Sequence, residues 1–238
     1  MTDRVAEAFA AVRTDPELAL LDGFHVLKHA LRFGAEILAA ATADRAALDR
    51  LAAELAPDVA GRIGALVAER PLGGLVDRIP HTGVVAVARR PAFDAAAVLA
   101  ATGSAPVVLL EDPRHLGNAG AVVRVAAAAG AAGVLTTGAR DPWDPAALRG
   151  SAGLHFALPV GRAEPDALGG RPLVAFDPAG EPHGALPPGA LLAFGTERHG
   201  LSPALAARAD LRVRIPMRPG VSSLNLATAV AVVLFARA

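Results

Sequence analysis

The sequence predicts an α/β protein whose C-terminal half contains a parallel β-sheet. From Val107 onward, short apolar runs of strand length alternate with segments of helical composition. These runs contain few polar residues, which is typical of strands that are buried on both faces of a parallel sheet. Loops rich in glycine and polar residues follow several of the runs. Because parallel sheets bind ligands at the carboxyl ends of their strands, these loops are the first place to look for a functional site.

The first ninety or so residues predict a smaller α/β unit. Apolar residues at helical spacing predict a helix over residues 16–34 that ends at Gly34. Asp44 is placed to cap the N-terminus of the second predicted helix. The remaining predicted elements of this unit are strands at 36–43 and 83–88 and helices at 45–56 and 58–69. We therefore expect a small N-terminal domain over residues 1–97 and a larger C-terminal domain over residues 98–238.

The elements of the larger domain follow from its apolar runs. A helix is predicted within residues 117–134, and a second, strongly apolar helix over residues 222–238. Predicted strands occupy residues 107–112, 133–138, 173–177, 190–195 and 211–215.

The composition limits the chemistry that the protein can perform. The chain has no cysteine, which excludes disulfides, thiolate metal sites and a cysteine nucleophile. The histidines His25, His29 and His81 do not have the spacing of a metal site, so no metal is predicted. The charged N-terminus does not resemble a secretory signal, and no membrane span is predicted. We expect a soluble, cytoplasmic protein.

The charges are unevenly distributed, although the formal net charge is +0. Arg208, Arg212, Arg214 and Arg218 fall close together near the C-terminus. Two interpretations remain open. The arginines could form a basic face that binds phosphates, or they could be an ordinary solvated surface.

A single arginine interrupts an otherwise apolar helical segment. Residues 119–129 contain only alanine, valine and one glycine, apart from Arg124. Burying an unpaired guanidinium would cost more than this helix gains by packing, so Arg124 needs a function or an exposed position. The glycines before it do not form the G-x-G-x-x-G sequence of dinucleotide-binding loops, which argues against a nicotinamide cofactor.

Two further strand ends carry candidate site residues. Glu197 lies between Gly195 and Gly200, and glycines there would let a ligand approach the backbone. A surface loop leading to the next helix is the alternative interpretation. In the last loop, Ser223 and Asn225 lie at the start of a helix, which favours either an anionic ligand or simple capping. We expect Asn225 to lie inside the first helical turn, beyond the usual position of a capping residue.

Taken together, the three loops resemble the SpoU branch of the SPOUT RNA methyltransferases. The resemblance covers residues 107–238 and consists of three motifs in the family's order. The first motif matches Asn118, Gly120 and Arg124, the second matches Gly195, Glu197 and Gly200, and the third matches Ile215, Pro216, Met217, Ser223, Leu224 and Asn225. The N-terminal unit more weakly resembles the small, ribosomal-protein-like RNA-binding domain that precedes this catalytic domain in many members.

The resemblance implies a fold, a cofactor and a reaction. The C-terminal domain is expected to be a SPOUT domain with a parallel sheet and a deep trefoil knot. S-adenosylmethionine is expected to donate a methyl group to a ribose 2′-hydroxyl of RNA. The residues implied to bind this cofactor are Gly195, Ile215, Met217 and Leu224. The implied catalytic residues are Arg124, which would bind the phosphate beside the target ribose, and Asn118, Glu197, Ser223 and Asn225, which would orient the reacting groups.

The family also implies partners. Ribosomal RNA is favoured over transfer RNA as the substrate because of the leading RNA-binding domain, and the family is generally homodimeric. Two alternatives stay open at this point. The protein could be a tRNA 2′-O-methyltransferase, or a non-catalytic RNA-binding or ribosome-assembly protein on the same scaffold.

Overall fold

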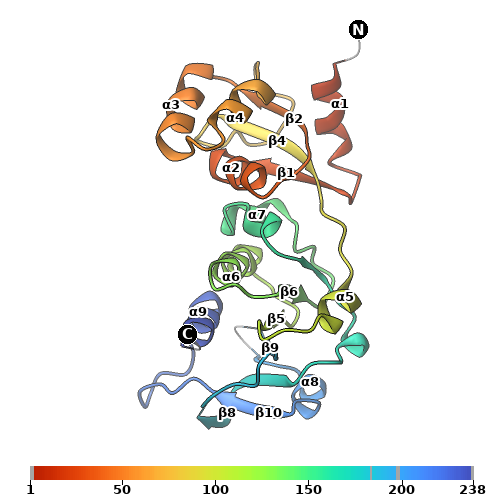
Figure 1. The fold of residues 1–238 in the computed structure, drawn as a ribbon, viewed down its shortest axis with the longest axis vertical. Coiled ribbons are helices and arrows are strands. Elements are labelled where there is room, and N and C mark those ends of the chain that lie inside the picture. The colour runs from red at the N-terminus through yellow and green to blue at the C-terminus, as the bar shows by residue number, and fades with distance from the viewer. Residues whose placement is uncertain (1–2, 183, 197–198, 237–238) are drawn as a thin grey trace. The chain divides into compact units, whose positions relative to one another are not determined.

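A computed structural model of the chain describes residues 3–182, 184–196 and 199–236 (Figure 1). Its contacts divide the chain into two compact units. The first unit comprises Met1–Ala92 and Trp143–Ala157, and the second comprises Phe93–Pro142 and Leu158–Ala238. The domain boundary expected at residue 97 assigns residues 143–157 to the second domain, whereas their contacts are with the first unit.

The first unit is built on a mixed sheet. Its strands lie in the order β1-β4-β2-β3, and only the β2–β3 pair is parallel within the described residues. Its elements are α1 (Arg4–Ala11), β1 (Leu18–Asp22), α2 (Phe24–Arg32), β2 (Ile37–Thr42), α3 (Arg45–Leu55), α4 (Ala60–Leu66), β3 (Ala68–Glu69), β4 (Val84–Arg89) and α7 (Pro145–Gly150), followed by a 3-10 turn at Leu154–Phe156.

The single helix predicted over residues 16–34 is wrong in its first part. Leu18–Asp22 is a strand that pairs antiparallel with β4, and α2 begins only at Phe24. Gly23 separates the two elements with a φ of 105°, and the Thr82 hydroxyl accepts a hydrogen bond from the Phe24 N–H at 3.0 Å. The sequence "LALL" suits a helix or a strand equally well, so tertiary pairing with β4 decides its conformation.

The other predicted elements of this unit are confirmed. The structure places strands at β2 and β4 and helices at α3 and α4, within a few residues of the predicted ranges. Asp44 caps α3 as predicted, since its carboxylate accepts the Ala47 N–H at 2.8 Å. Helix α1 and the two-residue strand β3 were not predicted.

Residues 143–157 belong to the core of the first unit. Trp143, Leu148 and Phe156 are buried with apolar residues of α2 and β4. Gly153 makes the close approach possible. A Cβ atom there would lie 2.5 Å from the Val26 carbonyl oxygen, and its φ of +83° favours glycine. Arg149 adds an ion pair with Asp22.

The second unit contains a parallel sheet of six strands in the part of the chain that the structure describes. The strand order is β10-β8-β9-β5-β6-β7, and every neighbouring pair is parallel. Its elements are α5 (Ala95–Ala100), β5 (Val107–Leu110), α6 (Leu116–Ala128), β6 (Gly133–Thr136), β7 (Val160–Arg162), a 3-10 turn at Pro165–Ala167, β8 (Leu173–Pro182), β9 (Leu191–Phe194), α8 (Pro203–Ala207), β10 (Leu211–Arg214) and α9 (Leu226–Phe235).

This sheet is covered on both faces, as the apolar runs predicted. Along β5, Val108 and Leu110 pack with α6 and α9, whereas Val107 and Leu109 pack on the opposite face with α5 and α8. Figure 1 shows the two helical layers on either side of the strands. All five predicted strands of this domain are present. Helix α5 and strand β7 were not predicted, and the last helix begins four residues later than predicted, at Leu226.

The described residues contain neither a helix that could span a membrane nor a group of side chains that could hold a metal ion. None of their helices is long and apolar enough to cross a membrane. Nor do they contain a group of three His, Asp or Glu side chains that could hold a metal ion.

Arg171 connects three segments of the second unit through hydrogen bonds. Its guanidinium donates to the carbonyl oxygens of Val98, Leu99, Ala101, Ala105 and Gly189 at 2.7–3.3 Å. All five of its N–H donors are therefore used. Three of the acceptors lie at the C-terminal end of α5, where carbonyl groups lack helical partners.

We predict that Arg171→Lys lowers the free energy of unfolding by about 3 kcal/mol. A lysine has three donors on a single nitrogen and leaves at least two of these carbonyl groups unpaired. Urea denaturation measures the change. Arg140→Lys, at an exposed position of the same unit, is the control and should change stability by less than about 0.5 kcal/mol. Equal losses in the two variants would contradict the assignment.

Candidate ligand site at the carboxyl end of the parallel sheet

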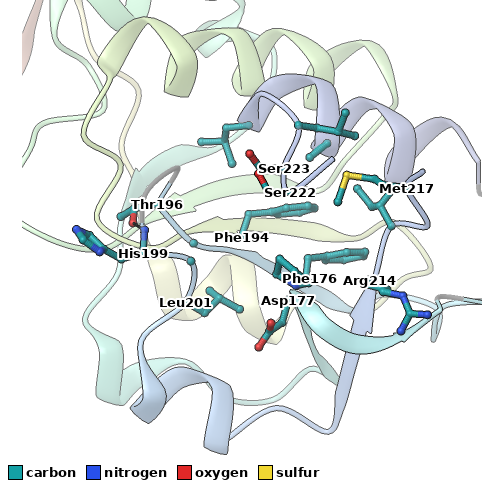
Figure 2. A pocket seen from close by; sticks show the side chains of 17 residues that line it. Phe176, Asp177, Phe194, Thr196, His199, Leu201, Arg214, Met217, Ser222 and Ser223 are labelled. Atoms are coloured by element: carbon teal, nitrogen blue, oxygen red, sulfur yellow. Dashed lines mark hydrogen bonds between the residues drawn. The ribbon is translucent and has the colours of Figure 1, made fainter. Parts of the chain in front are cut away.

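A cavity of about 440 Å³ lies at the ends of β9 and β10, beside the middle of β8 (Figure 2). Its volume is in the range of small-molecule sites. It is lined by Phe176, Asp177, Pro178, Phe194, Gly195, Thr196, His199, Gly200, Leu201, Arg214, Ile215, Met217, Ser222, Ser223, Leu224, Leu226 and Ala229. The position agrees with the rule that parallel sheets bind ligands at their carboxyl ends.

Two stacked phenylalanines form an apolar wall of the cavity. Phe176 on β8 and Phe194 on β9 are register partners, and their rings lie parallel with centroids 4.6 Å apart. In Figure 2 the Phe194 ring lies between Phe176 and the two serines, with Met217 beside it. This wall offers a flat apolar surface to a planar ligand group.

The second motif forms a closed loop directly after β9. Thr196 and Gly200 exchange two backbone hydrogen bonds of 3.0 Å each. A Cβ atom on Gly195 would lie 1.9 Å from the Gly200 carbonyl carbon, so no residue larger than glycine fits there. Gly200 has a φ of +65°. Both motif glycines are thus explained by loop closure, and Glu197 between them lies outside the described residues.

The third motif supplies backbone groups to the cavity. Ile215, Met217, Ser223 and Leu224 all line it. Across residues 216–224, the described backbone makes a single backbone–backbone hydrogen bond, from Val221 N–H to Arg218 C=O. The other N–H and C=O groups of this segment are available to a ligand or to water, since backbone polar groups rarely stay unpaired.

Asn225 connects the third motif to the first. Its side-chain amide donates to the Asn118 side-chain oxygen at 3.4 Å. Its own side-chain oxygen accepts the N–H groups of Ala227 and Thr228. Asn225 is therefore the N-cap of α9, and the expectation that it lies inside the first turn is wrong. The helix starts at Leu226, later than the predicted residue 222, because Asn225 is its N-cap.

Arg124 is exposed on α6 and does not line the cavity. The guanidinium makes no hydrogen bond or ion pair with any other described residue. The cost of burying an unpaired charge, which made this residue conspicuous in the sequence, is therefore not incurred. Its position leaves the positive charge available to a partner from solution.

The arginines near the C-terminus are mostly engaged within the chain. Arg208 and Arg214 donate to backbone carbonyl groups, and Arg212 forms an ion pair with Asp177 at 2.6 Å. The Ala179 N–H and the Arg212 guanidinium lower the pKa of Asp177 below its usual value. Among the four, only Arg218 makes no such contact with a described side chain or carbonyl group.

The two wall residues and the contact of Glu111 with the residue after the second-motif loop were not predicted from the sequence. Phe176 and Phe194 end similar apolar runs, "LVAF" and "LLAF", but their pairing depends on β8 and β9 being neighbours. Glu111, at the end of β5, binds Ser202 through both carboxylate oxygens. An acidic side chain that directly follows a buried strand could have marked Glu111 as a candidate residue of the site.

These features define an α/β domain that binds a small ligand in a cavity built from strand-end loops. The family model described as "SpoU rRNA Methylase family" matches residues 105–235, more than half of the chain. The chain therefore belongs to the SpoU methylase family.

Known proteins of similar sequence and structure agree with this assignment. An uncharacterized tRNA/rRNA methyltransferase of Mycobacterium tuberculosis is 37% identical over 213 residues, which cover 79% of this chain and 71% of the relative. A 23S rRNA (adenosine(1067)-2′-O)-methyltransferase of Streptomyces laurentii is 36% identical over 57% of this chain and 54% of its own length. The SpoU methyltransferase AviRb of Streptomyces viridochromogenes, solved with AdoMet, superimposes with a TM-score of 0.77 at 27% identity, over 99% of this chain and 96% of AviRb.

We predict that Gly195→Ala destabilises the second unit by about 2 kcal/mol or more, because its Cβ would overlap backbone atoms that cannot rotate away. Urea denaturation provides the measurement. Gly169→Ala is the matched control, since a Cβ there meets nothing within 4 Å. Unchanged stability of Gly195→Ala would show that the loop is not closed as described.

Proposed function

We propose that the protein is an S-adenosylmethionine-dependent RNA methyltransferase that methylates a ribose 2′-hydroxyl, with ribosomal RNA as its substrate. The observation that carries the proposal is the cavity. It brings together Gly195, Ile215, Met217 and Leu224, the four residues that the family resemblance assigns to the cofactor. Three relatives with named substrates are 23S rRNA 2′-O-methyltransferases. Family membership also supports the trefoil knot expected in this domain.

The residues of the cavity suit S-adenosylmethionine. The stacked Phe176 and Phe194 rings offer an apolar surface for an adenine ring. The backbone groups of residues 216–224 offer donors and acceptors for the polar edge of adenine and for the ribose hydroxyls. When bound there, this cofactor supplies an electrophilic methyl group on a sulfonium. The chain itself must bind the RNA, align the ribose oxygen and accommodate the proton that leaves it.

Four side chains near this site meet these needs. Ser223 lines the cavity, and the Asn118–Asn225 contact lies at the N-terminus of α9. These three groups orient the ribose next to the cofactor. Arg124 binds the phosphate beside the target ribose and stabilises the charge that develops on the hydroxyl oxygen. A guanidinium hardly deprotonates in proteins, so positioning and electrostatics are its role here, rather than that of a base. Glu197 keeps the orienting role that the family resemblance gives it.

The choice of ribosomal over transfer RNA rests on the relatives and on the first unit. A tRNA (cytidine(34)-2′-O)-methyltransferase of Burkholderia pseudomallei matches only 21% of this chain, whereas the rRNA enzymes match more than half. The first unit serves as the RNA-binding domain. An rRNA substrate also fits the cytoplasmic location expected from the sequence.

The test is methyl transfer by the purified protein with labelled S-adenosylmethionine. Ribosomal RNA and tRNA from a strain lacking the gene are offered separately, and the modified nucleotide is mapped by its resistance to alkaline cleavage. Label in a 2′-O-methyl group of rRNA is the expected result. Label in tRNA alone would favour the tRNA alternative. Calorimetry that finds no binding at millimolar cofactor would favour the non-catalytic alternative.

We predict that Arg124→Ala reduces methyl transfer by roughly a hundredfold or more, since it removes one charge that stabilises the transition state. The dissociation constant for S-adenosylmethionine should stay within about twofold of wild type, because Arg124 does not line the cavity. Arg124→Lys should retain part of the activity, because it keeps the charge and loses the planar fork. Wild-type turnover by Arg124→Ala would refute this role.

The proposal includes a homodimer. Val232 and Phe235 lie on one face of α9, three residues apart, and are 40% and 54% exposed. Val221 and Leu224, just before this helix, are also exposed. A second copy of the chain would cover these apolar side chains.

We predict that Phe235→Glu converts the dimer to a monomer, because it places a charge in an apolar interface. Light scattering after size-exclusion chromatography measures the mass. Phe33→Glu is the control, since Phe33 is similarly exposed, at 49%, in the first unit. A monomeric wild type, or a variant that still dimerises, would contradict this interface.

A further inference from the structure

The second motif loop is anchored at both ends, and the second anchor is a carboxylate that lies far away in the sequence. Glu111 directly follows β5, and its N–H donates to the Phe194 carbonyl oxygen at 2.9 Å. One carboxylate oxygen of Glu111 accepts the Ser202 N–H, and the other accepts the Ser202 hydroxyl, both at 2.6 Å. Hydrogen bonds to an ionised acceptor at this length are stronger than neutral ones.

Ser202 transmits this contact to the next helix. Its hydroxyl oxygen also accepts the Leu205 N–H at 3.2 Å, which makes Ser202 the N-cap of α8. Helix α8 has only 5 residues, so it cannot fix the end of the loop by itself. The rigid tip of β5 supplies the fixed point instead.

The loop between these anchors forms one wall of the cavity. Gly195, Thr196, His199, Gly200 and Leu201 all line it, and Figure 2 shows Thr196, His199 and Leu201 on this side. The Phe194 end of the loop is fixed by β9, and the Thr196–Gly200 bridge closes the loop on itself. The Leu201 side chain packs against the cluster that contains Leu109 and Ala193. Its backbone makes no hydrogen bond to the sheet among those of the described residues, and the Glu111–Ser202 pair holds the residue next to it.

We propose that Glu111 is a positioning residue for cofactor binding: through Ser202 it holds Gly200 and Leu201 in the place that the cofactor requires. The inference rests on the proposed function for the identity of the cofactor. The alternative is that Glu111 only stabilises α8. If Glu111 positions the loop, removing its contact weakens cofactor binding. If Glu111 only stabilises α8, removing the contact lowers stability and leaves cofactor affinity unchanged.

The variant of choice is Glu111→Gln, which keeps the size of the side chain. Its amide group can accept only one of the two Ser202 donors and turns an N–H donor toward the other. We expect the dissociation constant for S-adenosylmethionine to rise about tenfold or more, and the KM for this cofactor to rise in parallel. The kcat at saturating cofactor and the KM for RNA should stay within about twofold. Ser202→Ala, which keeps the backbone N–H bond, should raise the dissociation constant by a smaller factor of about three.

Asp94→Ala is the matched control. Asp94 caps α5 in the same unit through hydrogen bonds to Ala96 and Ala97, away from the cavity. This variant should lower the melting temperature and leave the dissociation constant unchanged. If Glu111→Gln behaves like the control, or loses kcat with an unchanged cofactor KM, the positioning role is wrong.

Hydrogen exchange without cofactor tests the anchor itself. Peptides that contain Gly200–Ser202 should exchange faster in Glu111→Gln than in wild type, while peptides from β5 and β9 should not change. Unchanged exchange at 200–202 would overturn the proposal. If wild type binds no S-adenosylmethionine, the proposed function fails, and this exchange experiment still decides whether Glu111 holds the loop.

Discussion

The pairing of β8 with β9 is the constraint on which the rest of the second unit depends. Its register sets Phe176 opposite Phe194 and brings Leu173 and Leu191 together at the other end. The two strands start level, and β8 continues past the end of β9, so Asp177 and Pro178 on β8 lie at the same cavity as the loops that follow β9 and β10. A shift of one residue would turn Phe194 toward the opposite helical layer and away from Phe176. The cavity exists because this register does.

Much of the second unit could be predicted from its sequence, because the signals that specify it are local. A run such as "VVLL" is apolar at every position and contains β-branched valines, which favours a strand covered on both faces. The first unit was harder to predict, because part of it is specified by pairing between distant segments rather than by local signals. In "LALLDGFHVLKHALRFG" the apolar spacing suits a helix throughout, and only the pairing of Leu18–Asp22 with β4 makes its first part a strand. Long-range pairing of this kind leaves no local trace.

The site shows the same division. The family motifs identified the cavity residues Gly195, Ile215, Met217, Ser223 and Leu224, because the chain order of these residues is visible in the sequence. The aromatic wall and the Glu111–Ser202 contact were not visible, since each joins segments whose adjacency follows only from strand order. Asn225 was predictable in part. Its place near a helix N-terminus was predictable, but its bond to Asn118 required α6 and α9 to pack together.

The loops around the cavity differ in how much of their conformation the chain itself determines. The loop after β9 is fixed by two glycines, a backbone bridge and the Glu111 carboxylate, so its shape does not need a ligand. Residues 216–224 make few backbone hydrogen bonds of their own, so a bound ligand would complete what the fold leaves unpaired. One wall is therefore preorganised, and the other exposes backbone groups that a ligand can bind in place of water. Such a cavity ties ligand affinity to the order of the second wall, because each backbone group that the ligand satisfies also fixes the segment that carries it. Arg124 is exposed and does not line the cavity, so the phosphate recognition that we propose for it does not depend on the order of this wall.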